Sequence, residues 1–142
     1  MANYVGCVRT NYFRVKDMDA FKDIVSRIAS EDKVSLFVNE ENPELVGFGS
    51  LSSIMGIYPE KYDEDEDIDF CTDELAAELQ KVVAEDDAII MTEVGNEKLR
   101  YVSGGAYIIT SREIQYLDLK SIATHTAREM LQNPTWNTEH NY

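Results

Sequence analysis

The sequence predicts an α+β domain, a mostly antiparallel sheet of five to seven strands with three helices. Two observations carry this expectation. Residues 88–110 are rich in β-branched, aromatic and long apolar side chains, and turn-forming residues at 94–97 and 103–105 divide them, which predicts three consecutive strands. Elsewhere, apolar residues recur at intervals of three and four, which places them on one side of a helix.

The first part of the chain predicts a strand followed by a helix. Residues 3–15 have extended character, with aromatic and β-branched side chains. Asp17 is a suitable N-cap, because its side chain can accept a hydrogen bond from the first helical turn. The predicted helix runs to about Ser30, and its apolar stripe comprises Met18, Phe21, Ile24, Val25 and Ile28.

A hairpin is expected next, from residues 33–38 and 44–51. These two segments flank a loop that Pro43 keeps out of regular structure. Gly47 and Gly49 lie inside the return strand, where glycine indicates a bulge or the close approach of a neighbouring element.

The second half of the chain predicts two further helices. Residues 54–57 are expected to form a strand, and Thr72 to be the N-cap of the second helix, whose buried stripe is Leu75, Leu79, Val82 and Val83. Residues 113–117 predict an edge strand. Asp118 then caps the third helix and Asn133 ends it, with an inward face of Leu119, Ile122, Ala123, Ala127, Met130 and Leu131.

A weak internal repeat emerges when the chain is shifted by about 54 residues. The apolar positions of the first helix then lie over those of the second, and the turns and strands that follow stay in step. Any two helix–hairpin units share such a pattern, so duplication is not demonstrated. The order of elements favours a ferredoxin-like or tandem βαββ arrangement.

The length of 142 residues, 44% of them hydrophobic, predicts one domain over residues 1–133 and a polar tail over residues 134–142. Trp136 in this tail is expected to dock on the domain. Cys7 and Cys71 are far apart in sequence, and each is expected to be a small buried hydrophobe. With no signal peptide and no long apolar run, we expect a cytoplasmic protein that does not enter a membrane.

No catalytic arrangement is recognisable. His125 and His140 are the only histidines, and neither belongs to a hydrolase, metalloprotease or phosphate-binding motif. We therefore expect no enzyme, no catalytic residue, no cofactor and no metal site. The formal net charge of −14 disfavours direct nucleic-acid binding and favours a basic protein as partner. The oligomeric state stays open.

An acidic segment, residues 60–74, is the one constellation with chemical content. It holds nine acids and one lysine and so carries −8 of the chain's −14. A block of like charges is usually a solvated loop that repels itself. The candidate partner-binding residues are its first seven acids: Glu60, Asp63, Glu64, Asp65, Glu66, Asp67 and Asp69.

Calcium binding is one alternative for this segment. Positions 1, 3, 5, 7 and 12 of the EF-hand loop spacing are occupied by Asp63, Asp65, Asp67, Asp69 and Glu74. The match fails where the sharp turn requires glycine, because Ile68 stands there, and where a helix should enter, because Pro59 precedes the segment. Only a loose cation site is consistent with these departures.

A decoy surface is the other alternative. If residues 60–69 are extended at about 3.3 Å per residue, their seven acids are spaced at roughly 5 Å, within a factor of two of the phosphates on one DNA strand. A nucleic-acid-binding protein would then bind the segment as it binds its ligand, with an affinity that falls steeply with salt.

The segments EVGNEKLRYVSGGAYIITS and AREMLQNPTW resemble small acidic proteins of unknown function carried on conjugative and other mobile elements of gut Gram-positive bacteria. The resemblance implies no functional residue. It implies a context in which antirestriction and anti-CRISPR proteins, several of them small and acidic, occupy nucleic-acid-binding grooves. Two functions remain in view, an acidic interaction protein that blocks a basic partner, and a small-ligand or calcium-binding module, with Tyr101 or Tyr107 lining a site on the uncovered face of the sheet.

Overall fold

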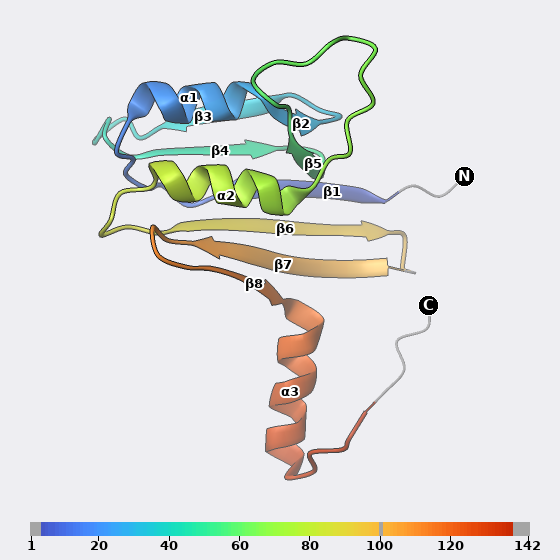
Figure 1. Ribbon diagram of the computed structural model, residues 1–142. Helices are drawn as coiled ribbons and strands as arrows, with labels where there is room; N and C mark the ends of the chain where they lie inside the picture. Colours follow the sequence, from blue (N-terminus) through green and yellow to red (C-terminus); the bar gives the residue numbers. More distant parts are fainter. Residues whose placement is uncertain (1–3, 100, 138–142) are drawn as a thin grey trace.

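Six strands form one antiparallel sheet, and two helices cover one of its faces (Figure 1). In spatial order the strands are β3 (Val34–Val38), β4 (Val46–Ser50), β1 (Val5–Thr10), β6 (Ile89–Glu97), β7 (Tyr101–Ile109) and β8 (Ile114–Asp118). A small second sheet pairs β2 (Ile28–Ser30) with β5 (Ile54–Ile57), and the helices are α1 (Met18–Ser26), α2 (Thr72–Val82) and α3 (Leu119–Leu131). The computed structural model describes residues 4–99 and 101–137.

The predicted α+β class with an antiparallel sheet is confirmed. Apart from the short strands β2 and β5, which form their own sheet, the chain order is a βαββαβ unit of β1, α1, β3, β4, α2 and β6. The four strands of this unit lie in the order β3-β4-β1-β6. This is ferredoxin-like connectivity. β7 and β8 extend the sheet beyond β6. The helices α1 and α2 begin 54 residues apart, in agreement with the offset of the repeat. The third strands of the two halves are not equivalent, because β5 belongs to the small sheet and β8 to the main sheet.

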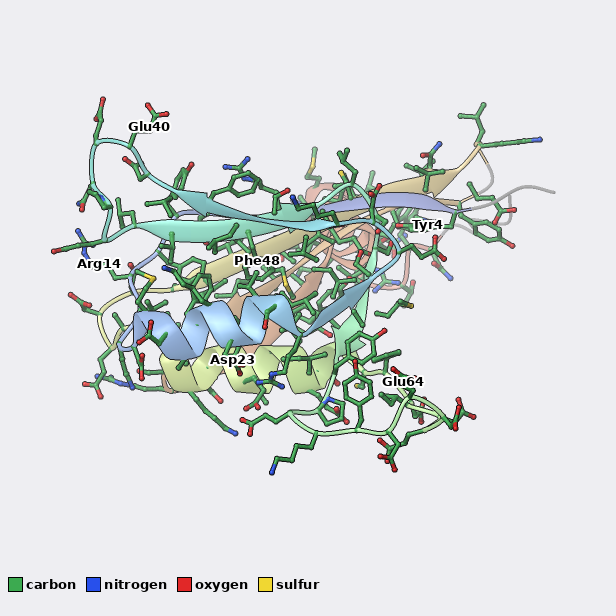
Figure 2. The ribbon with its side chains drawn as sticks, turned by 90° about the horizontal axis from the view of Figure 1, so that it is seen from above. Tyr4, Arg14, Asp23, Glu40, Phe48 and Glu64 are labelled. Atoms are coloured by element: carbon green, nitrogen blue, oxygen red, sulfur yellow. The ribbon has the colours of Figure 1, made fainter. Side chains whose placement is uncertain are left out.

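The core lies between the sheet and the pair α1 and α2, which lie side by side (Figure 2). Figure 2 places Phe48 of β4 in this layer, and the ring of Phe21 from α1 lies 6.3 Å from it, centroid to centroid. The predicted stripe of α2 is confirmed, since Leu75, Leu79 and Val83 are fully buried. The N-cap of α2 is Cys71, and Thr72, expected there, is the first helical residue.

Close backbone approach explains the glycines of β4. A Cβ added at Gly47 would lie 2.9 Å from the carbonyl oxygen of Asn11, and one at Gly49 would lie 2.7 Å from that of Val8. The expectation of a close neighbour at these two positions is confirmed, and the neighbour is β1 and the residue that follows it.

The expected three strands within residues 88–110 are wrong. β6 and β7 are two long strands paired without interruption from Ile89↔Ile109 to Glu97↔Tyr101. The reversal occurs after Glu97, where Lys98 has a positive φ of 51°. Glycines that indicated turns instead make room for rings, because a side chain at Gly95 would collide with Tyr4 and one at Gly105 with Tyr116.

Helix one is also shorter than expected. α1 ends at Ser26, and Ile28, assigned to its stripe, is buried in β2, where it pairs with Ile57. Arg27 joins the two elements: its backbone oxygen accepts a 2.7 Å hydrogen bond from the amide of Tyr58, and its guanidinium donates a 2.7 Å bond to the carbonyl of the same residue. A long-range pairing therefore replaces the last helical turn.

The first strand is shorter than the expected residues 3–15. β1 covers Val5–Thr10, and beyond it Phe13 and Val15 form isolated bridges with Val46 and Val83. Asn3, at the start of that expectation, lies outside the described residues. The predicted hairpin and edge strand are confirmed as β3–β4 and β8.

The expected inward face of helix three is wrong. Asp118 does cap α3, since its carboxylate accepts a 3.1 Å hydrogen bond from the amide of Ser121. None of the residues of α3 is buried, and the helix projects away from the sheet (Figure 1). The tail returns to α3 through its backbone, since the carbonyl of Trp136 accepts a 2.7 Å hydrogen bond from the Arg128 guanidinium.

Candidate functional site

The seven predicted acids lie on one projecting loop between β5 and α2. This acidic loop, residues 58–71, rises beyond the ends of both elements (Figure 1), and Figure 2 shows carboxylates pointing outward around Glu64. Glu60, Asp63, Glu64, Asp65, Glu66, Asp67 and Asp69 are all exposed. Across the described residues, the five salt bridges involve none of them. The loop therefore presents unneutralised charge to solvent.

Aromatic rings anchor the base of the acidic loop. Tyr58 stacks on Tyr62 at 5.1 Å between centroids and meets Phe70 edge-on at 4.9 Å, so the two ends of the loop are held together. Gly56 admits the returning chain, since a Cβ there would lie 2.8 Å from the amide nitrogen of Cys71. Sequence analysis missed this cluster, although the aromatic residues flanking the acidic run were its visible sign.

The calcium alternative finds no support in the positions of the carboxylates. Throughout the described residues, no group of three or more His, Cys, Asp or Glu side chains lies close enough to hold a metal ion. Glu74, which the EF-hand spacing requires as the last ligand, lies in the first turn of α2. The backbone of the loop makes one local turn, in which the amide of Glu66 donates to the carbonyl of Asp63 at 2.9 Å.

A small cavity lies beside the N-terminus of α2, on the helix-covered side of the sheet. Its volume is about 170 Å³, and its lining residues are Val8, Ile54, Thr72, Met91, Glu93, Gly105, Tyr107 and Tyr116. The rings of Tyr107 and Tyr116 lie 4.9 Å apart at 59°. Tyr107 donates a 2.7 Å hydrogen bond to Asp73, which joins the cavity to the helix that follows the acidic loop.

Burial changes the acid–base properties of the cavity wall. The pKa of Glu93 is raised by desolvation, while a hydrogen bond from the backbone of Ile54 opposes the rise. Desolvation also raises the pKa of Tyr107 and of Tyr116, and the hydrogen bond to Asp73 adds to the rise at Tyr107. Both phenols are therefore neutral donors at physiological pH.

Within the described part of the chain, no layer of helices covers the outer face of the main sheet, opposite α1 and α2. We define it by the strand residues that point away from the core: Val5, Cys7, Arg9, Ser35, Phe37, Gly47, Gly49, Ile90, Thr92, Val94, Asn96, Val102, Gly104, Ala106, Ile108, Gln115 and Leu117. Tyr101 and Tyr107, expected here, alternate to the opposite face with Ile109. The expectation that a tyrosine lines the uncovered face is therefore wrong.

The two cysteines are exposed and free, contrary to the expectation of burial. Cys7 lies on the outer face, next to Val94 of the neighbouring strand, and Cys71 lies at the start of α2. Both positions belong to surfaces that a sequence cannot place before the fold is known.

Comparison with known proteins adds no relative: no protein-family model, no curated protein and no solved structure matches the chain. A separate finding bears on membranes. Within residues 4–99 and 101–137, no helix is both long and apolar enough to cross a bilayer.

Proposed function

We propose that this protein is a non-enzymatic interaction protein whose acidic loop binds a basic surface of another protein. One observation carries the proposal, namely seven exposed carboxylates without ionic partners on a loop that aromatic rings hold at its base. Anchoring lowers the entropy that the loop loses on binding. The formal charge of −14 steers a basic partner toward the protein from a distance.

The finer form of the proposal is a decoy, in which the acidic loop occupies a groove that otherwise binds nucleic acid. The loop turns between Asp63 and Glu66, so the decoy form requires it to extend on binding. Its carboxylates would then be spaced at roughly 5 Å and approach the charge density of a single DNA strand. Such a partner is expected to release the protein as salt rises, because the Debye length falls from about 8 Å at physiological ionic strength to about 3 Å at 1 M. A mobile-element origin would give this blocking activity a purpose.

A capture experiment with two charge-matched variants tests the proposal. The loop variant replaces Asp63, Glu64, Asp65, Glu66 and Asp67 by their amides. The control variant makes the same change at five exposed acids elsewhere: Asp19, Glu31, Glu40, Glu41 and Asp86. Parent and variants are immobilised and exposed to a bacterial lysate, and bound proteins are eluted in salt steps. Candidate partners are then expressed, purified and titrated with each form.

We expect a basic partner that the parent and the control variant bind and the loop variant does not. For the decoy form, duplex DNA should compete with the parent for that partner. Equal loss of binding in the two variants would mean that net charge, not the acidic loop, is recognised. Full binding by the loop variant would overturn the proposal.

A second candidate function, small-molecule binding, is favoured by the cavity at Glu93. Its floor is apolar, from Val8, Ile54 and Met91, and its polar side chains supply a carboxyl, two phenols and the hydroxyl of Thr72. This lining suits a molecule of a few heavy atoms with a hydrogen-bonding end and an apolar body. Thermal-shift titration with small amines and amides tests it, and Tyr116→Phe and Glu93→Gln should each weaken any stabilisation that parent protein shows. The absence of stabilisation across such a panel would count against this candidate.

A further inference from the structure

The outer face combines apolar side chains with an absence of acids. Val5, Ile90, Val94, Val102 and Leu117 are large apolar residues on it, and each is exposed. Although the chain has 27 acids, none occupies an outward strand position of the described sheet. Its single charged residue is Arg9, whose guanidinium lies 4.0 Å from the ring centre of Phe37. Exposed apolar surface of this extent is typical of an interaction site.

The helix α3 extends this surface and is itself without cover. It has 13 residues and none is buried, with Leu119, Ile122, Met130 and Leu131 all exposed. An isolated helix of about 12–15 residues is marginally stable in water, so α3 requires a surface to pack against. At its start Leu119 lies over the sheet, since a Cβ on Gly104 would contact its Cδ2 at 3.4 Å. The outer face and α3 are therefore continuous.

We propose that the outer face and α3 bind a second copy of this chain in a two-fold dimer. Each copy offers an uncovered sheet and an uncovered amphipathic helix, so in a two-fold arrangement the α3 of one protomer covers the sheet of the other. Charge permits this occupant at the outer face only. Two chains of −14 repel, and the outer face is where they can approach without bringing strand acids together. α3 contributes Lys120 and Arg128 against one acid, Glu129.

The available area is close to what a stable dimer needs. Four strands at about 4.8 Å spacing, each contributing about five residues of 3.3 Å, give a planar footprint of roughly 300 Å² for the outer face. A 13-residue helix is about 20 Å long and 10 Å wide, which adds roughly 200 Å². Each contact between an α3 and the partner's sheet is limited by the helix, so two contacts counted on both sides bury about 800 Å² of footprint before the relief of the side chains is added, close to the lower limit of specific interfaces.

Two valines provide a matched test. Val94 on the outer face and Val38 at the opposite edge are each 47% exposed, and both lie in strands. Val38 points to the helix-covered side, because it pairs with Val46 of the core. Val94→Glu places an unpaired charge twice in the proposed interface, and we expect it to weaken self-association by about 100-fold or more. Val38→Glu should leave self-association unchanged.

The measurement is the molar mass of the full chain by sedimentation or light scattering, from about 1 to about 100 µM, a range that covers modest interfaces. We expect the parent to have twice the chain mass, Val94→Glu to have the single mass with a cooperative unfolding transition, and Val38→Glu to match the parent. A parent that stays monomeric at the highest concentration overturns the proposal and leaves the face to another protein. A dimer that survives Val94→Glu overturns it as well, since self-association then uses another surface.

The cysteines give an independent readout. Cys7 lies on the outer face and Cys71 at the N-terminus of α2, on the other side of the sheet. In the proposed dimer a thiol reagent should modify Cys71 rapidly and Cys7 slowly, and Val94→Glu should expose Cys7 without changing Cys71. A Cys71→Ser variant assigns the slow phase. Equal rates at both cysteines in a dimeric parent would place the dimer interface elsewhere.

Discussion

At the scale of single residues, Glu93 is where charge and burial conflict. It lies on the core side of β6, between Met91 and Gly95, in the part of the sheet where α2 begins and the core gives way to the cavity. Burial raises its pKa above the usual value of 4.5, so the folded protein binds its proton more tightly than the unfolded chain does. The folded state is thus penalised when Glu93 ionises.

The pH dependence of the Glu93→Gln variant follows from the raised pKa of Glu93. Between the unfolded pKa and the raised folded pKa, the native state holds more protons, so the free energy of unfolding of the parent falls as pH rises. The variant lacks this loss and keeps an amide oxygen that can accept from Ile54. We expect Glu93→Gln to be more stable than the parent at pH 7 and to lose that advantage below about pH 4, where both forms are neutral. Thermal melts across this range measure it, and an advantage that grows toward low pH would contradict the argument.

At the scale of elements, the two faces of β7 differ in what covers them. Ile109 is fully buried under the helices, whereas its neighbour Ile108 points to the outer face, between Ile90 and Gln115. The sequence does not distinguish the two, because adjacent isoleucines in a strand give no indication of which face is covered.

This difference predicts unequal costs for the same substitution. Ile109→Ala should lower the free energy of unfolding by about 2–5 kcal/mol, the cost of a large-to-small change in a packed core, and Leu79→Ala in α2 should cost about the same. Ile108→Ala should cost about 1 kcal/mol or less. Urea titrations in a Val94→Glu background remove any contribution from a second copy. Equal costs at Ile108 and Ile109 would mean that the outer face is covered within one chain.

The helices also predict distinct exchange behaviour. α2 buries Leu75, Ala76, Leu79 and Val82, while α3 buries nothing in one chain. Amide hydrogen exchange in Val94→Glu should therefore be slow in α2 and fast throughout α3, because local opening costs little where no contacts are lost. In the parent, protection of α3 should rise with protein concentration. Strong, concentration-independent protection of α3 in Val94→Glu would contradict this prediction.

At the scale of the whole molecule, charge and packing occupy separate parts of the chain. The acidic loop contributes no side chain to the core between residues 59 and 67, and its carboxylates add to the self-repulsion of a chain of −14. The core is instead supplied by α1, α2 and the strands beneath them. Function and stability can therefore be varied independently.

The loop variant tests this separation without reference to a partner. Changing Asp63, Glu64, Asp65, Glu66 and Asp67 to their amides should leave the melting temperature unchanged or raise it slightly, and the gain should shrink in high salt as repulsion is screened. Differential scanning calorimetry at low and high ionic strength measures both effects. A melting temperature well below that of the parent would show that these carboxylates stabilise the fold.

The sequence by itself determined the features that depend on residues close together in the chain. The spacing of Leu75 and Leu79, the caps Asp17 and Asp118 and the β3–β4 hairpin all follow from local geometry, and the acidic loop is evident from composition alone. These features fixed the α+β class and the exposed acids, because helix periodicity, capping and charge repulsion act within a few residues.

Only the tertiary structure decided which surfaces are covered. In the sequence Gly95 and Gly105 resemble turn residues, but in the fold they lie in strands beneath Tyr4 and Tyr116. Likewise α3 has the apolar spacing of a core helix, but none of its residues is buried. The aromatic anchor of the acidic loop and the cavity at Glu93 likewise join residues distant in sequence. The physical reason is that an apolar stripe predicts that a helix face is buried, whereas the surface that buries it depends on the packing of the whole chain, or of two chains.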